Sequence, residues 1–494
     1  MNRIVLAAAL TLGACAPAAP ALVPAPARAP VAMALDSIFG DTLFARAQWG
    51  VLVRSLETGE TLYQRNAEKL FVPASNQKIV TGAFALETLG PDFRYRTSVE
   101  AEGPVSGGVL AGSLVVRGSG DPTISARFGG VRPLFRAWAD SLRARGVTRI
   151  AGAVVGNDDV FDDVPLGRGW AWDDLDASYS AEVSGLQLNE GYVTVRVGPG
   201  ARPGDPAVVT LDPATAYTPV INQATTGAPG TARAAEATRA PLGPGIVVTG
   251  TVPPDSAAEE IEVAVRDNTL FFAAALRESL IEAGIRVDGP ALDDDARPDS
   301  ARRPATRLFV HTSPPMPEVL AAFLKPSQNQ IGEILLKTMG RQLRGAGTAS
   351  AGLAVEDSLA RAWALPPRAL RPADGSGLSR YNLVAPEFLT ALLERMTRSP
   401  HNAVFYDAMP VAGVDGTLRN RMKGTPLEGN VHAKTGTLSG VRSLSGYLTT
   451  AAGERLVFAI LVNNHTLSAA AADRVSEAAL LRVYHHPRTR AGRD

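Results

Sequence analysis

Lysine is rare in this chain, and two of its six lysines stand in short motifs that can support catalysis. Lys78 follows Ser75 by three positions in Ser75-Asn76-Gln77-Lys78, and Lys434 begins the tripeptide Lys434-Thr435-Gly436. Arginine, which supplies the rest of the basic charge, keeps its proton in proteins, whereas a desolvated lysine can lose it and act as a general base. The pattern therefore predicts a serine nucleophile that is activated by lysine.

A helix must position the first of these motifs. Apolar residues recur at helical spacing after Ser75, and Gly90-Pro91 ends the run. Residues three apart on a helix share one face, and a hydroxyl at the helix start meets the positive end of the helix dipole. Six lysines would give about 0.3 such serine–lysine pairs by chance. Taken alone, the pair is therefore better explained as part of a solvent-exposed helix face.

Two further motifs are placed beside regular elements. Lys434-Thr435-Gly436 precedes a β-rich run over residues 441–450, which predicts a strand edge where glycine lets a substrate backbone approach. The alternative interpretation of this tripeptide is a turn with a surface lysine. Ser327-Gln328-Asn329 follows the helix-breaking Lys325-Pro326 and precedes a predicted helix over 329–343. Its alternative interpretation is a serine that caps that helix.

In this order the three motifs resemble the set shared by penicillin-binding proteins and serine β-lactamases. Ser327 comes 249 positions after Lys78, a gap far longer than in common β-lactamases. The gap is similar to that of penicillin-binding protein 4-type D-alanyl-D-alanine carboxypeptidases (peptidase family S13), in which two extra domains lie between the first two motifs. The middle residue Gln328 departs from the aspartate that this family often has. Other stretches that resemble the family are Gly118–Thr123, Gly169–Asp174, Asp374–Arg380, Gly413–Leu418 and Ala433–Tyr447.

The resemblance implies an α+β fold. Its core would be a penicillin-binding protein/serine β-lactamase-like transpeptidase domain, an antiparallel sheet flanked by helices, with two nested, mostly β inserted domains. The absence of lysine and the many Gly and Pro residues in 95–305 agree with an insertion, and 225–244 is expected to be a long loop. The expected borders are 33–94 and 306–494 for the catalytic domain, 95–121 and 208–305 for inserted domain II, and 122–207 for inserted domain III. Hairpins are predicted over 49–63 and 441–462, and a helix over 467–484.

The resemblance also implies a covalent acyl-enzyme mechanism on peptidoglycan stem peptides, with β-lactams as inhibitors and no cofactor or metal. Ser75 would attack the carbonyl between two D-alanines, and Lys78 would take its proton. Ser327 would relay that proton to the leaving amine, while Asn329 would hold Lys78 and the substrate amide. A neutral lysine near pH 7 needs a pKa lowered by about 3 units, which burial and Lys434 are expected to provide.

Substrate-binding roles follow from the same resemblance. Lys434 and Thr435 would bind the terminal carboxylate, with Gly436 beside them, and the backbone N–H groups of Ser75 and Thr437 would form the oxyanion hole. A small polar pocket would hold the diaminopimelate side chain of the stem peptide, with Tyr179 and Trp172 as walls. The residues expected in this pocket are Asp174, Ser376, Leu378, Arg380, Leu438 and Ser439.

Two other functions compete with a carboxypeptidase or DD-endopeptidase. A β-lactamase would share the acylation step but hydrolyse the acyl-enzyme quickly, and the long insertion argues against it. A lipoprotein with a relic site would only bind cell-wall peptide, and the intact motif residues argue against that. A Ser-His-Asp hydrolase is disfavoured because the chain has no Gly-x-Ser-x-Gly motif.

The N-terminus is predicted to be a targeting segment. A basic start and a short apolar run precede Leu12-Gly13-Ala14-Cys15, which resembles the cleavage motif of bacterial lipoproteins. Residues 1–14 would be the signal peptide, and 15–32 an Ala/Pro tether lipidated on Cys15; a secretory signal with an incidental cysteine is the alternative. The expected location is the cell envelope or periplasm, with the lipid as the sole membrane contact, in the outer membrane if the cell is Gram-negative. The balanced charge implies no nucleic-acid partner.

Overall fold

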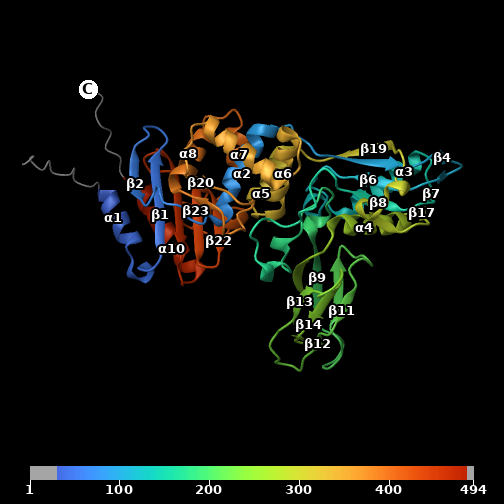
Figure 1. The fold of residues 1–494 in the computed structure, drawn as a ribbon. Helices are drawn as coiled ribbons and strands as arrows, with labels where there is room; N and C mark the ends of the chain where they lie inside the picture. The colour runs from blue at the N-terminus through green and yellow to red at the C-terminus, as the bar shows by residue number, and fades with distance from the viewer. Residues whose placement is uncertain (1–29, 487–494) are drawn as a thin grey trace, which may run out of the picture.

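The structure is a computed structural model, and it describes residues 30–486 (Figure 1). The signal peptide, Cys15 and nearly all of the predicted tether lie outside these residues. The predicted tether border at residue 32 is wrong, because α1 (Pro30–Phe39) begins earlier and buries Val31 and Leu35 in the core. No helix within 30–486 combines the length and the apolar character that crossing a membrane requires.

One five-stranded antiparallel sheet joins the two ends of the chain. Its order is β2-β1-β24-β23-β22, so the first hairpin pairs with strands from the last seventy residues. The predicted hairpins around 49–63 and 441–462 are confirmed. The strands are β1 (Gln48–Ser55), β2 (Thr61–Arg65), β22 (His432–Leu438), β23 (Val441–Thr449) and β24 (Arg455–Asn463).

Helices cover both faces of this sheet. Along β24, alternate residues such as Val457 and Ala459 face one core and Phe458 and Ile460 face the other, as the two-residue period of a strand requires. One layer contains α1 and α10 (Ala469–Tyr484), so the helix predicted over 467–484 is confirmed to within two residues. The other layer contains α2 (Gln77–Leu89), α5 (Met316–Leu324), α6 (Asn329–Arg344), α7 (Ala349–Ala362), α8 (Pro386–Met396) and α9 (Asn402–Ala408).

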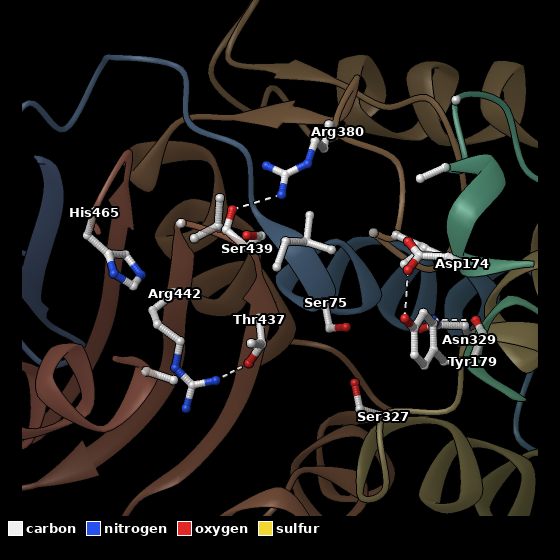
Figure 2. Close-up of a pocket in the computed structure, with 18 of the residues that line it drawn as sticks. Ser75, Asp174, Tyr179, Ser327, Asn329, Arg380, Thr437, Ser439, Arg442 and His465 are labelled. Carbon is white, nitrogen blue, oxygen red and sulfur yellow. Dashed lines mark hydrogen bonds between the residues drawn. The ribbon is translucent and has the colours of Figure 1, made fainter. Parts of the chain in front are cut away.

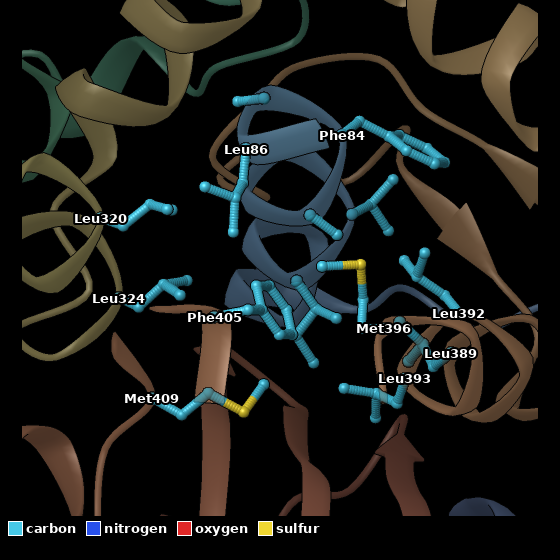
Figure 3. Packing of buried hydrophobic residues seen from close by; sticks show 14 of the residues in the cluster. Phe84, Leu86, Leu320, Leu324, Leu389, Leu392, Leu393, Met396, Phe405 and Met409 are labelled. Carbon is cyan, nitrogen blue, oxygen red and sulfur yellow. The ribbon is translucent and has the colours of Figure 1, made fainter. Parts of the chain in front are cut away.

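Helix α2 lies at the centre of the second layer and is buried on all sides. Figure 3 shows Phe84 and Leu86 of α2 surrounded by apolar side chains from α5, α8 and α9. Each such fully buried side chain stabilises the fold by about 1.5–3 kcal/mol. The helix that carries Lys78 is therefore held rigidly by its neighbours.

The chain leaves this domain after α2 and forms the elongated part on the right of Figure 1. Here a five-stranded sheet has the order β18-β8-β6-β3-β19, beside a smaller sheet β17-β7-β5-β4. Its longer strands are β3 (Arg96–Ala101), β6 (Leu114–Arg117), β8 (Val154–Asn157), β18 (Ala291–Asp293) and β19 (Thr306–Thr312). The small sheet is β4 (Val105–Ser106), β5 (Val109–Leu110), β7 (Arg149–Ile150) and β17 (Arg286–Val287), and the helices are α3 (Val131–Ala144) and α4 (Asn268–Glu282).

A second β unit extends below it in Figure 1. Strand β9 is central to one sheet, between β10 and β16, and β14 is central to another, between β11 and β13. A parallel pair of short strands, β12 and β15, completes the unit. The bounds are β9 (Tyr192–Gly198), β10 (Val208–Asp212), β11 (Val220–Asn222), β12 (Thr225–Thr226), β13 (Glu236–Arg239), β14 (Ile246–Thr249), β15 (Thr251–Val252) and β16 (Glu259–Ala264).

This pairing corrects the predicted borders of the inserted domains. Strand β8, placed in domain III, pairs with β6 of domain II, while β10 and β16, placed in domain II, pair with β9 of domain III. Strand β19, placed in the catalytic domain, pairs with β3. The predicted loop over 225–244 is also wrong, because β12 and β13 lie in it. Strands that are distant in sequence form these sheets, so local composition could not locate the borders.

Candidate active site

Ser75 lies on a one-turn 3₁₀ helix, Ala74–Asn76, directly before α2. The predicted start of the α-helix at Ser75 is therefore wrong by two residues. Ala74 has φ +47, a left-handed conformation that a non-glycine residue adopts at a cost, and such strain is common at functional sites. The turn is tied to the sheet, because the Asn76 side chain donates to the Lys434 carbonyl at 2.8 Å and the Ser443 hydroxyl donates to the Pro73 carbonyl at 2.7 Å.

Lys78 makes three polar contacts from a completely buried position. Its Nζ lies 3.0 Å from Ser75 Oγ, 2.6 Å from Asn329 Oδ1 and 2.6 Å from the Ser376 carbonyl oxygen. An ammonium group has three hydrogens to donate. A neutral amine can donate to the Asn329 and Ser376 oxygens and direct its lone pair at the Ser75 hydroxyl. The same geometry therefore serves both protonation states.

Burial lowers the pKa of Lys78 to about 7, although the carboxylates of Asp374 and Glu333 raise it. The sequence predicted that Lys434 would contribute to this lowering. Burial is the largest cause of the lowering, and the two buried amines repel each other, which contributes to the lowered pKa of Lys434. Burial is also the larger cause of the Lys434 shift, which takes its pKa well below the usual range.

Ser327 and Asn329 reach the same place from the chain before α6. Lys434 Nζ lies 2.8 Å from Ser327 Oγ, and the Asn329 amide donates to the Tyr179 carbonyl at 2.8 Å while its oxygen meets Lys78. Ser327 has φ +68 and does not cap the helix, contrary to the alternative interpretation. Gln328 is the cap, and its side chain accepts from the backbone N–H of Ile331 at 2.9 Å.

The loop over residues 374–379 is fixed by a buried carboxylate that sequence reasoning missed. Asp374 accepts from the backbone N–H groups of Gly377 at 2.8 Å and Ser379 at 2.7 Å. It also accepts from the Asn382 amide at 2.7 Å and from Trp170 Nε1 at 3.0 Å. Trp170 and Asp374 both lie in stretches that the sequence matched to the family, but no local pattern indicated that they touch.

A second buried acid lies under the same loop. Glu333 accepts from the backbone N–H groups of Gly375 at 3.0 Å and Ser376 at 2.9 Å. Burial, followed by the charge of Asp374, raises its pKa to about 7. These bonds fix the Ser376 carbonyl that contacts Lys78. The Ser376 side chain is completely buried and donates to Asp374, so the structure does not place it in the predicted side-chain pocket.

Two glycines allow the motif segments to meet. A Cβ on Gly436 would lie 2.2 Å from Ser443 Oγ, 2.7 Å from the Pro73 oxygen and 2.9 Å from the Ser75 nitrogen. A Cβ on Gly377 would lie 1.9 Å from the Ala74 oxygen. Both clashes involve the backbone of the turn that carries the nucleophile. The sequence predicted that glycine is needed at position 436 so that a substrate backbone can approach. This needs correction, because the turn that carries Ser75 occupies the space where a Cβ at this position would lie.

A cavity of about 680 Å³ opens over Ser75 (Figure 2). In Figure 2, Asp174 and Tyr179 lie on one side of Ser75 and Arg442 lies on the other. Tyr179 Oη donates to Asp174 at 2.7 Å, and burial together with this bond raises the pKa of Tyr179 to about 12. The Arg380 guanidinium donates to the Ser439 carbonyl at 2.8 Å.

Predicted site residues that line the cavity are Ser75, Ser327, Asn329, Thr437, Asp174, Leu378, Arg380, Leu438 and Ser439.

The remaining predicted residues are placed differently. Lys78 and Lys434 are completely buried behind the cavity wall, and Thr435 is 6 % exposed and lines a neighbouring cavity. Trp172 does not line the main cavity and is 84 % exposed, so only Tyr179 of the two expected aromatic walls is found there.

One group of side chains among the described residues has the spacing of a metal site. The carboxylates of Asp158, Asp293 and Asp295, at the ends of β8 and β18, place oxygens within 4.8 Å of one another. None of the three lines the cavity over Ser75. The contact between Lys78 Nζ and Ser75 Oγ at 3.0 Å gives the cavity a hydroxyl nucleophile with an amine base beside it.

Comparison with known proteins supports the same chemistry. The sequence model of the "D-Ala-D-Ala carboxypeptidase 3 (S13) family" matches residues 31–483. The chain is 36% identical over 444 residues to D-alanyl-D-alanine carboxypeptidase of Actinomadura sp. (strain R39), covering 87% of this chain and 80% of that protein. It is 27% identical over 430 residues to D-alanyl-D-alanine carboxypeptidase DacB of Haemophilus influenzae, covering 84% and 85% of the two chains.

A solved structure shares the fold. The crystal structure of penicillin binding protein 4 (dacB) from Haemophilus influenzae matches with a TM-score of 0.79 at 24% sequence identity. The match covers 93% of this chain and all of the other. The predicted α+β fold, with its penicillin-binding protein-like catalytic domain, is therefore confirmed.

Proposed function

Because the chain belongs to the D-Ala-D-Ala carboxypeptidase 3 (S13) family, we propose that Ser75 is the nucleophile of a serine D-alanyl-D-alanine peptidase. The enzyme would release terminal D-alanine from peptidoglycan stem peptides, cleave D-alanyl cross-links, or do both. The family assignment confirms the family that the three motifs and their order indicated. The individual residue roles are our proposal, and they rest on the geometry around Ser75.

The contact between Lys78 and Ser75 carries this proposal. A base must lie within hydrogen-bond reach of the proton that it takes, and Lys78 Nζ lies 3.0 Å from Ser75 Oγ. Its pKa of about 7 leaves a large neutral fraction at neutral pH. Ser75 would then form an ester with the D-alanyl carbonyl while the amide C–N bond breaks. Water would hydrolyse the ester in a second step.

The leaving amine needs a proton when the C–N bond breaks. Ser327 is the proposed donor, because its hydroxyl lines the cavity and lies 2.8 Å from Lys434 Nζ. Lys78, once protonated, would return its proton through this hydroxyl, and Asn329 would hold Lys78 in place. Backbone N–H groups of Ser75 and Thr437 are the proposed oxyanion hole. The carboxylate of the leaving group was predicted to bind to Lys434 and Thr435; because Lys434 is completely buried and does not line the cavity, we propose Thr437 with Thr435 in its place.

A polar pocket on the Asp174 side of Ser75 would bind the third residue of the stem peptide. Asp174 and Arg380 both line the main cavity, and a diaminopimelate side chain ends in an ammonium and a carboxylate that these two charges complement. Leu378, Leu438 and Ser439 line the same cavity. The pocket is proposed without Ser376, whose side chain points to Asp374.

Purified protein with defined muropeptides tests the proposed function. We expect the wild type to release D-alanine or to cleave cross-links, and Ser75→Ala to do neither. Substrates with diaminopimelate at the third position should be preferred over those with lysine by about tenfold in kcat/KM, and Asp174→Ala should reduce that preference. Equal activity of the wild type and Ser75→Ala would remove Ser75 from the mechanism.

The low pKa of Lys78 predicts how acylation depends on pH. The base must be neutral, so the second-order rate of Ser75 acylation by a chromogenic cephalosporin should rise as pH increases through about 7. Below that midpoint the rate should fall about tenfold per pH unit. Stopped-flow or steady-state measurements between pH 5 and 9 give the profile. A midpoint near the ordinary lysine value would contradict the assignment of Lys78 as the base.

The β-lactamase alternative makes an opposite prediction for the same cephalosporin. A β-lactamase would turn it over rapidly, whereas the proposed peptidase forms a long-lived acyl-enzyme. The family match over residues 31–483 favours the peptidase. Rapid turnover would favour the alternative.

A lipid on Cys15 is the proposed anchor in the cell envelope. Leu12-Gly13-Ala14-Cys15 motivates the proposal, and Cys15 lies outside the described residues. Fractionation of cells that express wild type or Cys15→Ala tests it, because only the wild type should sediment with membranes. Equal recovery of the wild type and Cys15→Ala in the soluble fraction would contradict lipidation of Cys15.

A further inference from the structure

A second cavity, of about 560 Å³, borders the first one. Thr437 and Arg442 line both cavities, so the two are neighbours across these side chains. Thr435 also lines the second cavity. Figure 2 shows Thr437 between Ser75 and Arg442, on the side of Ser75 opposite Asp174. The second cavity therefore continues the cleft away from the proposed side-chain pocket.

The second cavity is lined by three basic side chains and by no carboxylate. Lys325 is neutralised by Asp415, at 2.6 Å, and Arg442 is paired with Asp473. Arg419 is exposed, and within residues 30–486 its guanidinium has no hydrogen-bond or ion-pair partner. An arginine presents a planar donor fork that fits a carboxylate. Arg419 is thus the basic group of this cavity that is available to a ligand.

The turn that carries Arg419 is fixed against the catalytic motifs. Thr435 Oγ1 donates to Thr417 Oγ1 at 2.8 Å, and the Thr417 N–H donates to the Lys325 carbonyl at 3.0 Å. Gly416 has φ +55, and a Cβ there would lie 2.6 Å from the Lys325 oxygen. Arg419 follows this turn directly. Its backbone is therefore held beside the strand that carries Thr435.

The next step rests on the proposed function, in which Asp174 and Arg380 bind the acyl side of the substrate and Thr435 and Thr437 bind the leaving group. On that orientation, the second cavity lies on the leaving-group side. Cavities of about 300–1,000 Å³ hold drug-sized ligands, so this one is much larger than a single D-alanine requires. A leaving group that fills it must extend beyond its amine.

We propose that the second cavity is an anion subsite for the second stem peptide of a cross-linked dimer, and that Arg419 pairs with a carboxylate of that peptide. In the reaction, Ser75 Oγ bonds to the D-alanyl carbonyl carbon, the cross-link C–N bond breaks, and the second stem peptide leaves as a protonated amine. A pentapeptide monomer loses only D-alanine, which does not extend to Arg419. Arg419 is then a residue that determines preference for cross-linked substrate.

The test compares kcat/KM for a cross-linked tetrapeptide dimer with kcat/KM for a pentapeptide monomer, using the full chain. In Arg419→Glu, the dimer-to-monomer ratio should fall by at least about tenfold, because an attraction becomes a repulsion. Arg419→Lys keeps the charge but loses the planar donor fork, so the ratio should fall by no more than about threefold from that of the wild type. Arg46→Glu, the same charge reversal at an exposed position before β1, should leave the ratio unchanged. Thermal melting of each variant confirms that it is folded.

The possible outcomes separate this subsite from the proposed function. A wild type that attacks neither substrate refutes the proposed function. A wild type that attacks both, with the same ratio in Arg419→Glu, overturns the subsite and leaves the function intact. Equal losses on dimer and monomer also overturn the subsite, as does a wild type that attacks the monomer alone.

Discussion

Replacement of Lys78 by arginine is expected to slow acylation of Ser75 by about a thousandfold, within the range by which a positioned general base accelerates a reaction. Arginine keeps the positive charge and the donors but cannot give up its proton at any accessible pH. Lys78 Nζ lies 3.0 Å from Ser75 Oγ, and burial lowers its pKa to about 7. The measurement is the rate of covalent labelling by a fluorescent penicillin under single-turnover conditions.

Two controls separate loss of the base from loss of structure. Lys78→Met is neutral and of similar length, so it removes the base without placing a permanent cation beside Lys434. Both variants should keep a cooperative thermal transition, because α2 is packed on all sides by apolar side chains. Acylation of Lys78→Arg within about tenfold of the wild-type rate would show that another group takes the proton.

Gly436→Ala is expected to lower the acylation rate by about a hundredfold, since a displacement of about 1 Å at a reacting group has an effect of that size. The added Cβ would lie 2.7 Å from the Pro73 oxygen and 2.9 Å from the Ser75 nitrogen. Ser75 lies in the turn that carries the nucleophile and Pro73 directly precedes that turn. Backbone atoms at these positions cannot rotate away as a side chain can. Ser75 must therefore move. Penicillin-labelling rates measure the effect.

A double variant identifies which contact causes the loss. The closest atom to the added Cβ is Ser443 Oγ, at 2.2 Å, so Gly436→Ala/Ser443→Ala removes that clash and keeps the two backbone clashes. The double variant should remain slow. Gly198→Ala, in β9, is the matched control, because its Cβ would meet Ala258 at an ordinary 3.4 Å. Full recovery of the rate in the double variant would contradict the backbone explanation.

The sequence predicted the parts of the catalytic domain that depend on local pattern. The two hairpins have clear alternation and turns, and α6 follows Lys325-Pro326 as expected. The order and spacing of three short motifs indicated the family, which the match over residues 31–483 confirms. The structure then brings Ser75, Lys78 and Asn329 within hydrogen-bond distances. The roles proposed for these residues are tested by the variants described above.

Features that depend on tertiary contacts could not be predicted. Asp374 and Trp170 are 204 positions apart, and nothing in either segment indicates their hydrogen bond. Which strands belong to which inserted domain likewise depends on pairing between distant segments, such as that of β8 with β6. Gly436 was predicted to admit a substrate backbone, whereas the backbone atoms that a Cβ there would meet belong to Pro73 and Ser75, more than 350 positions away. In each case the deciding contact joins distant parts of the chain.

The measurement that tests the central claim most directly is the position of a penicillin label on the protein. Trypsin cleaves after Lys69 and Lys78, which releases residues 70–78 as one peptide with Ser75 as its single hydroxyl residue. We predict that mass spectrometry finds the penicilloyl mass on this peptide in the wild type and finds none in Ser75→Ala. A label on any other peptide, or a wild type that forms no covalent adduct, would contradict Ser75 as the nucleophile.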